Sequence, residues 1–205
     1  MNPKYLGDSY DIVKQSLLRW LGGVGTWTTH PMFTEPVSAE QADTFSRLLG
    51  TRLLSHDTLT NVTDRDTYLA PARNSNDHVF LDPDTGIRSK PTRGIKAPRY
   101  LFGTELVSIA NARPERLILV FDQALGRGEE RKQLQTKLND FAQQGVLGVA
   151  YVSHACFVLV GKNRTLLQSA FETLKRESRL PDGRFLLLNS QNQAVHRIAE
   201  KAGSR

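Results

Sequence analysis

The sequence predicts an α/β protein with a three-layer, Rossmann-like and mostly parallel sheet covered by helices on both faces, in a single domain over residues 1–205. Short apolar runs alternate along the chain with amphipathic segments of ten or more residues, as in parallel sheets with crossover helices. The clearest runs are apolar throughout, which is typical of strands buried on both faces. No repeat or linker divides the chain, and 205 residues suit one hydrophobic core.

Periodicity and turn residues define the elements of the first half. Apolar residues at three- and four-residue spacing predict helices, whereas short runs rich in β-branched and aromatic residues predict strands. Asp8 or Ser9 is a suitable helix cap, and three glycines within 22–25 end that first helix. The expected elements are a helix over 10–21, a strand over 26–30, a helix over 39–54, a polar loop over 55–77 and a strand over 78–81.

The second half continues the alternation. The run Leu117-Ile118-Leu119-Val120-Phe121 is the clearest buried strand, and a break near Ser153-His154 divides the apolar stretch 147–160 into two strands. The expected elements are helices over 103–112, 129–144, 164–177 and 191–202, and strands over 117–121, 147–160 and 185–188.

Composition narrows the class of protein. Hydrophobic residues make up 39% and charged residues 23%, which excludes disordered, collagen-like and coiled-coil chains. The single cysteine, Cys156, excludes an internal disulfide and a multi-cysteine zinc site, and it lies in an apolar run typical of a core. No apolar run approaches the ~20 residues that span a bilayer, and no signal peptide is evident, so we expect a cytoplasmic protein.

Charge indicates an anionic partner. The chain has 27 Lys and Arg against 21 Asp and Glu, a net charge of +6. A segment between Ile87 and Tyr100 has no acidic residue, and we call it the basic loop. It is either a solvated connection or a phosphate-contacting loop. Its cations are Arg88, Lys90, Arg93, Lys96 and Arg99.

Polar residues follow several predicted strands. His30, Asp82, Asp84 and Asp122 lie at or just after carboxyl ends, where ligands of such sheets bind. Asp82-Pro83-Asp84 is the sharpest local feature because proline fixes the backbone between two acids. The two carboxylates are candidates for accepting hydrogen bonds from an amino or hydroxyl group. Alternatively, together with Glu105 or Asp122, they could hold magnesium, or they could only cap backbone amides.

Other motifs give weaker signals. No pair of histidines has the spacing of a zinc site on a helix, and no nucleophile elbow surrounds Ser153. The glycines within 22–25 precede a strand, whereas a phosphate loop must follow one. Gly126-Arg127-Gly128 does follow a strand and precede a helix, so Arg127 and the neighbouring amides are candidates for anion binding.

A family resemblance rests on three strings. Gly7-Asp8-Ser9-Tyr10-Asp11-Ile12-Val13-Lys14, then Thr29-His30, then Asp82-Pro83 resemble, in order and coarse spacing, the bacterial methyltransferases that modify adenine N6 in large-subunit ribosomal RNA. The likeness covers roughly the first half of the chain. The string Asp-Pro-Asp-x-Gly, with later residues such as Gln123 and Arg127, is also similar to a related, uncharacterised bacterial family.

The resemblance implies roles for particular residues. Asp82 would contact the target amino group, and Lys14 and His30 would line an S-adenosylmethionine site. Asp84 stands where the family has the second proline of Asp-Pro-Pro-Tyr, and it is a catalytic candidate in the magnesium hypothesis. The basic loop and Arg127 would hold the phosphates of RNA or DNA. The cofactor loop departs from the family, because Pro31-Met32-Phe33-Thr34 stands where the family has Ala-Gly-x-Gly.

Three hypotheses follow. The first is a nucleic-acid-acting protein of methyltransferase-like fold, as a divergent or degenerate S-adenosylmethionine-dependent methyltransferase. The second is a magnesium-dependent nuclease or phosphohydrolase that uses Asp82 and Asp84, with Glu105 and Lys90 beside them. The third is a non-catalytic module that binds nucleic acid or a partner through the basic loop.

Overall fold

A seven-stranded sheet forms the centre of the protein in the computed structural model, which describes residues 1–187. Its strand order is β2-β1-β3-β6-β8-β7-β9. Neighbours from β2 to β6 pair in parallel, and β8 runs antiparallel to both β6 and β7, so β7 keeps the parallel direction. The strands are β1 (Trp27–His30), β2 (Arg52–Leu53), β3 (His78–Leu81), β6 (Ile118–Phe121), β7 (Leu147–Tyr151), β8 (Phe157–Gly161) and β9 (Phe185–Leu187).

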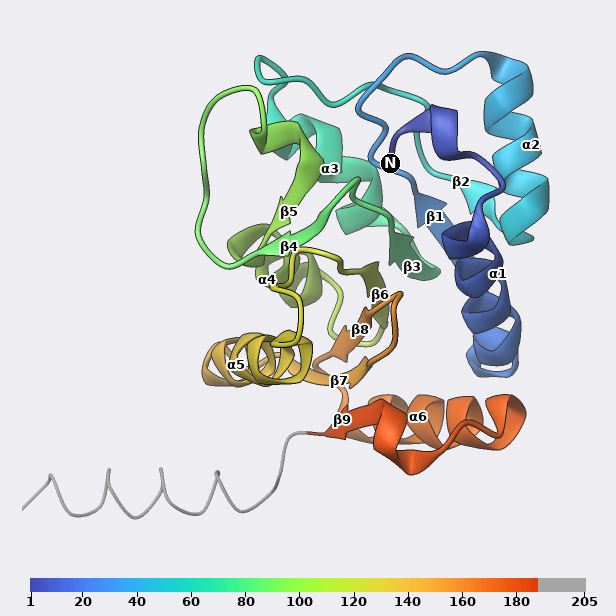
Figure 1. The fold of residues 1–205 in the computed structure, drawn as a ribbon, viewed down its shortest axis with the longest axis vertical. Helices are drawn as coiled ribbons and strands as arrows, with labels where there is room; N and C mark the ends of the chain where they lie inside the picture. Colours follow the sequence, from blue (N-terminus) through green and yellow to red (C-terminus); the bar gives the residue numbers. More distant parts are fainter. Residues whose placement is uncertain (188–205) are drawn as a thin grey trace, which may run out of the picture.

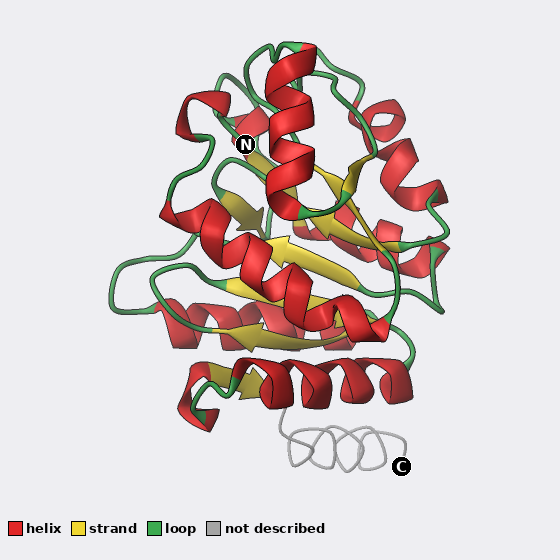
Figure 2. Ribbon diagram, turned by 90° about the vertical axis from the view of Figure 1, so that its right-hand side faces the viewer, coloured by secondary structure: helices red, strands yellow, loops and turns green. Residues whose placement is uncertain are grey.

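Helices cover both faces of this sheet, so the three-layer Rossmann-like α/β prediction is confirmed (Figure 1). One face carries α1 (Ser9–Leu21), α2 (Ala39–Leu49) and α6 (Arg164–Ser178), which cross in front of the strands in Figure 2. The other face carries α3 (Arg65–Asn74), α4 (Gly103–Ala112) and α5 (Glu130–Gln143). Each face buries its own apolar cluster, as a sheet covered on both sides requires.

Local sequence explains most helix ends. Asp8 caps α1 as expected, and its side chain accepts the backbone N–H of Tyr10 at 2.8 Å and of Asp11 at 3.1 Å. The helix then buries Leu17, Leu18 and Leu21 against the sheet. Cys156 is buried in the core on the opposite face. The predicted helices at 103–112, 129–144 and 164–177 are confirmed to within one residue.

The predicted helix over 39–54 is too long. It ends at Leu49 because Gly50 adopts a left-handed conformation with φ 68°, which closes the helix. The next residues, Arg52 and Leu53, form β2 at the edge of the sheet beside β1. The apolar residues after Leu49 therefore continue the periodic pattern by coincidence of spacing rather than as part of the helix.

The prediction of a loop over 55–77 is wrong in its second half. Asp64 caps α3, and its carboxylate accepts the Asp66 N–H at 3.2 Å. Pro71 lies inside the helix, where it removes only one backbone donor, and Tyr68 and Leu69 are buried against α4 and the sheet. The polar composition of this segment and its proline disfavour a helix. Tertiary packing of a narrow apolar stripe stabilises the helix nevertheless.

The basic loop is shorter than predicted. Its ends pair in parallel as β4 (Gly86–Arg88) and β5 (Tyr100–Phe102), which form a small separate sheet. Residues 89–96 connect them, and a short 3₁₀ turn covers Ala97–Arg99. The predicted helix over 191–202 and the end of the predicted strand at Leu188 lie outside the described residues. None of the helices within residues 1–187 is both long and apolar enough to span a bilayer.

Gly86 should be essential for stability because its φ is +133° and a Cβ there would overlap Asp122 Oδ1 and lie 2.7 Å from Gln123 N. We expect Gly86→Ala to lower the free energy of unfolding by about 3 kcal/mol in urea denaturation. Gly94→Ala is the matched control, since φ there is +87° but nothing lies within 4 Å of the added atom. We expect about 1 kcal/mol for it. Equal losses for both variants would contradict this account.

Candidate functional site

The order of the strands reverses between β1 and β3. The chain leaves β1 for β2 on one side and returns to β3 on the other. Ligands of open α/β sheets bind outside the carboxyl ends of strands at such a switch point. His30, Asp82 and Asp122 lie at or directly after β1, β3 and β6, so the structure places them on one edge. It does not place them in one pocket.

A cavity of about 260 Å³ opens at this edge above β3 and β6, and we call it the Asp82 pocket. Helix α1 supplies one wall, the segment after β3 another, and the start of the chain a third. The residues that matter for its chemistry are Tyr10, Asp11, Lys14, Asp82, Asp84, Phe121 and Gln123. Tyr10 and Phe121 meet edge to face with ring centroids 5.7 Å apart, so the pocket has an aromatic wall.

Lys14 connects two buried carboxylates beneath this pocket. Its Nζ lies 2.8 Å from Asp11 Oδ1 and 2.9 Å from Asp82 Oδ2, and it also lies 4.8 Å from the centre of the Phe121 ring. Burial alone would lower the pKa of Lys14, but Asp82 and Asp11 together raise it, so the lysine stays charged. Burial raises the pKa of Asp82, and Lys14 opposes that shift. When both acids are ionised, the group has one excess negative charge.

Asp82 keeps one oxygen without a partner. Its Oδ1 is buried and has no hydrogen bond within the described part of the chain. The Met1 amino nitrogen lies close by and donates to the carbonyl oxygens of Pro31, Met32 and Asp82 at 3.2, 2.6 and 3.1 Å. A buried acceptor without a donor is costly. Because Asp82 lines the pocket, its carboxylate is a group there with hydrogen-bonding capacity left.

His30 lies on the other face of the sheet from Lys14. Its Nε2 is 3.0 Å from the Tyr68 carbonyl oxygen, and the two rings meet edge to face at 4.8 Å. Burial lowers the pKa of His30 to about 4, so the ring is neutral at pH 7. Nδ1 is buried without a partner among the described residues. The two residues expected to share a cofactor site, Lys14 and His30, are therefore separated by the sheet.

The carboxylates of the magnesium hypothesis have separate basic partners. Besides Asp82 with Lys14, Asp84 pairs with Arg99 at 3.1 Å. Glu105 pairs with Arg65 at 2.5 Å, and Asp122 pairs with Lys137 at 2.7 Å. No group of three or more His, Cys, Asp and Glu side chains within residues 1–187 has the arrangement of a metal site. These residues do not fit a magnesium ion, which needs unpaired carboxylates around one point.

The segment after β1 does not fit S-adenosylmethionine in the manner of the family. Met32 and Phe33 are buried in the core, and Met32 adopts a φ of +46°. The carbonyl oxygens of Pro31 and Met32 bind the Met1 amino nitrogen. Side chains and the start of the chain thus cover the backbone that a glycine-rich loop would leave open to a cofactor.

The predicted phosphate-binding residues differ in their contacts. Arg99 is anchored beside the Asp82 pocket by Asp84, and the Thr85 N–H donates to the Arg99 carbonyl oxygen at 2.8 Å. Arg88 stacks over the Tyr100 ring at 5.2 Å. The other candidate cations are exposed and have no ion pair with the described residues: Lys90, Arg93, Lys96 and Arg127.

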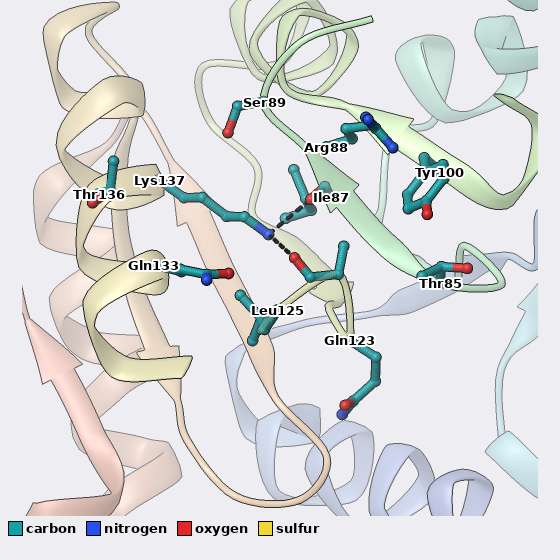
Figure 3. Close-up of a pocket in the computed structure, with 11 residues that line it drawn as sticks. Thr85, Ile87, Arg88, Ser89, Tyr100, Gln123, Leu125, Gln133, Thr136 and Lys137 are labelled. Atoms are coloured by element: carbon teal, nitrogen blue, oxygen red, sulfur yellow. Dashed lines mark hydrogen bonds between the residues drawn. The ribbon is translucent and has the colours of Figure 1, made fainter. Parts of the chain in front are cut away.

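A second cavity of about 570 Å³ lies beside the first, between α5 and the β4–β5 sheet (Figure 3). We call it the Tyr100 pocket. At its floor, Lys137 Nζ binds Asp122 Oδ2 and the Ile87 carbonyl oxygen, both at 2.7 Å. Burial raises the pKa of Asp122, and Lys137 opposes the shift. Lys137 thus ties α5 to the middle of β4 and to the residue that follows β6.

Sequence reasoning did not single out Lys137 or Tyr100, and it gave Asp11 no role in the site. The spacing of Asp11 and Lys14, three residues apart in a helix, is a signal that was available. Lys137 belongs to a charged helix, and only the fold shows that it turns inward to Asp122. Scans against protein-family models, curated proteins and solved structures find no match to this chain.

Removing Lys14 should destabilise the protein strongly. We expect Lys14→Met to lower the free energy of unfolding at pH 7.5 by about 3–5 kcal/mol, because two buried carboxylates lose their cation. The loss should shrink as the pH falls, since burial raises the pKa of Asp82 and a protonated Asp82 no longer needs the cation. Lys132→Met, at an exposed pair with Glu129, should cost under about 0.5 kcal/mol. A loss below about 1 kcal/mol for Lys14→Met would contradict this reading.

His30 should make stability fall in mild acid. Its folded-state pKa of about 4 lies below the unfolded value of 6.5, so between these values the unfolded chain binds the proton and the folded chain does not. The free energy of unfolding therefore has its full value, as far as His30 is concerned, above pH 6.5. It falls by up to about 3 kcal/mol as the pH approaches 4. In His30→Gln the decrease should be smaller by that amount in urea titrations. Identical pH slopes in the two proteins would rule out the neutral buried histidine.

Proposed function

We propose that this protein binds nucleic acid, with an amino-bearing base in the Asp82 pocket and phosphates on the basic loop. The observation that carries the proposal is the unpartnered Asp82 Oδ1 beneath an open pocket. The exocyclic amino group of adenine or cytosine is a donor suited to a carboxylate oxygen. The resemblance to ribosomal RNA methyltransferases supports the same role for Asp82.

The size of the pocket favours a single base. Its volume of about 260 Å³ lies just below the ~300–1,000 Å³ that ligand pockets occupy. The aromatic wall of Tyr10 and Phe121 suits a flat ring. The volume suits one ring system better than a complete dinucleotide-sized cofactor.

The distribution of charge favours a nucleotide whose base points into the Asp82 pocket and whose phosphate points out. Inside the pocket, Asp11 and Asp82 face the single charge of Lys14, because burial lowers the pKa of the Met1 amino group to about 5. The excess of acid disfavours a phosphate there and favours an amino group. Outside, the exposed cations of the basic loop attract phosphates, and the ion pair of Arg99 with Asp84 holds this loop beside the pocket mouth. A nucleotide bound in this way places its amino group beside the acids of the pocket and its phosphate beside the cations of the basic loop.

The proposal is for binding and includes no catalytic step. Methyl transfer would need a cofactor site that the segment after β1 does not provide, and magnesium-dependent cleavage would need unpaired carboxylates. The geometry therefore supports the non-catalytic hypothesis best among the three, on a fold that resembles a methyltransferase.

Fluorescence anisotropy with labelled 12-nucleotide oligo(A), oligo(C) and oligo(U), as RNA and as DNA with T for U, tests the proposal. We expect tighter binding of the A and C strands, and a loss of about tenfold or more for oligo(A) in Asp82→Asn. Tyr10→Ala leaves the Lys14 ion pairs intact and should weaken oligo(A) binding by about fivefold through lost stacking. Asp43→Asn makes the same charge change at an exposed site and should have little effect.

Two outcomes would contradict the proposal. One is absence of binding to every strand at low salt. The other is binding that depends on salt but is the same for A, C and U strands and unchanged in Asp82→Asn, which would assign all affinity to the surface charge.

A further inference from the structure

The Tyr100 pocket has no role in the binding of a single base. It is the larger of the two cavities, at about 570 Å³ against 260 Å³. Figure 3 shows its walls: Gln133 and Thr136 project from α5 on one side, and Arg88 and Tyr100 lie on the β4–β5 side. Ile87 and Leu125 add apolar surface. Such a mixture of apolar floor and convergent polar groups is typical of a ligand site.

Two cationic side chains among the described residues, Lys137 and Arg88, line this pocket, and only Arg88 is free to bind a ligand. Lys137 is buried and bound to Asp122 and to the carbonyl oxygens of Ile87 and Ala124, so it has no donor left for a ligand. Arg88 is exposed and has no carboxylate partner within residues 1–187. One guanidinium at the rim therefore remains for one anionic group of a ligand.

The uncharged groups of the pocket suit a flat, polar ring. Tyr100 supplies an aromatic ring, and the Arg88 Cζ lies 5.2 Å from its centroid. Gln133 uses its Oε1 to accept the Gly126 N–H at 2.9 Å, and its amide nitrogen has no partner among the described residues. An aromatic platform beside a free amide donor is what a nucleobase needs for stacking and for an edge contact.

The two pockets are neighbours. Gln123 lines both, and its Nε2 donates to the His154 carbonyl oxygen at 2.8 Å, which fixes the side chain between them. The segment after β3 also lines both pockets: Pro83 and Asp84 line the Asp82 pocket, and Thr85 lines the Tyr100 pocket. A ligand longer than a single nucleotide can therefore contact both pockets.

We infer that the Tyr100 pocket binds the nucleotide next to the one whose base enters the Asp82 pocket. The ligand is then a single strand of at least two nucleotides, because paired bases cannot enter two separate pockets. The Arg88 guanidinium, which lies over the Tyr100 ring in the free protein, turns to the phosphate of the second nucleotide, and Tyr100 then stacks with its base. This inference rests on the proposed function of the Asp82 pocket and extends it from a base to a strand.

The test compares AMP with a labelled 8-nucleotide oligo(A) on the full chain and its variants. Two linked sites should make the oligonucleotide bind at least tenfold more tightly than AMP. Tyr100→Ala should weaken oligonucleotide binding roughly tenfold and leave AMP binding within twofold, and Tyr100→Phe should restore the oligonucleotide affinity. Gln133→Ala should weaken it severalfold, whereas Gln135→Ala, on the same helix but outside the pocket, should not. Unchanged AMP binding also shows that each variant is folded.

The outcomes separate this inference from the proposed function. If Asp82→Asn weakens oligo(A) binding but Tyr100→Ala does not, the strand avoids the Tyr100 pocket and the inference is wrong, while the proposed function stands. Equal losses of AMP and oligonucleotide in Tyr100→Ala would also overturn it, since both ligands would then use one pocket. Failure of the unaltered protein to bind either ligand would overturn both.

Discussion

The buried contact of Lys14 with Asp11 and Asp82 is the constraint on which the site depends. It joins α1 to the carboxyl end of β3 and fixes the position of Asp82. Replacing a buried ion pair by apolar residues is often neutral or stabilising, so such a pair is weak evidence of a role in stability alone. Here Lys14 binds one carboxylate oxygen of Asp82, and the other oxygen has no hydrogen bond among the described residues and lies beneath a pocket. Its position therefore fits recognition of a donor group.

A second lysine repeats this arrangement one strand further along the edge. Lys137 joins α5 to Asp122, and the backbone N–H of Ile87 donates to the same carboxylate at 2.9 Å. Every oxygen of Asp122 is used, in contrast to Asp82. The first lysine shapes a pocket with an unused acceptor, and the second secures the floor of its neighbour. Under the proposed function, a strand would lie along this edge with its bases inward.

The sequence predicted the layers of the fold because buried strands such as 117–121 are apolar throughout and lie between amphipathic helices. It missed α3 since Tyr68 and Leu69 form a narrow stripe in a polar segment with Pro71. Strand ends located Asp82 on the correct edge. They did not show that His30 faces the other side, because one residue of register decides the face of a strand. Ion partners such as Lys137 depend on tertiary contacts that no local pattern encodes.

A crystal structure of the protein with a short oligo(A) strand tests the central claim most directly. The account predicts that an adenine amino nitrogen lies within hydrogen-bonding distance of Asp82 Oδ1, with the next base beside Tyr100 and phosphates near the basic loop. A strand bound only to the exposed cations of the basic loop, with Asp82 Oδ1 still without a donor, would contradict it.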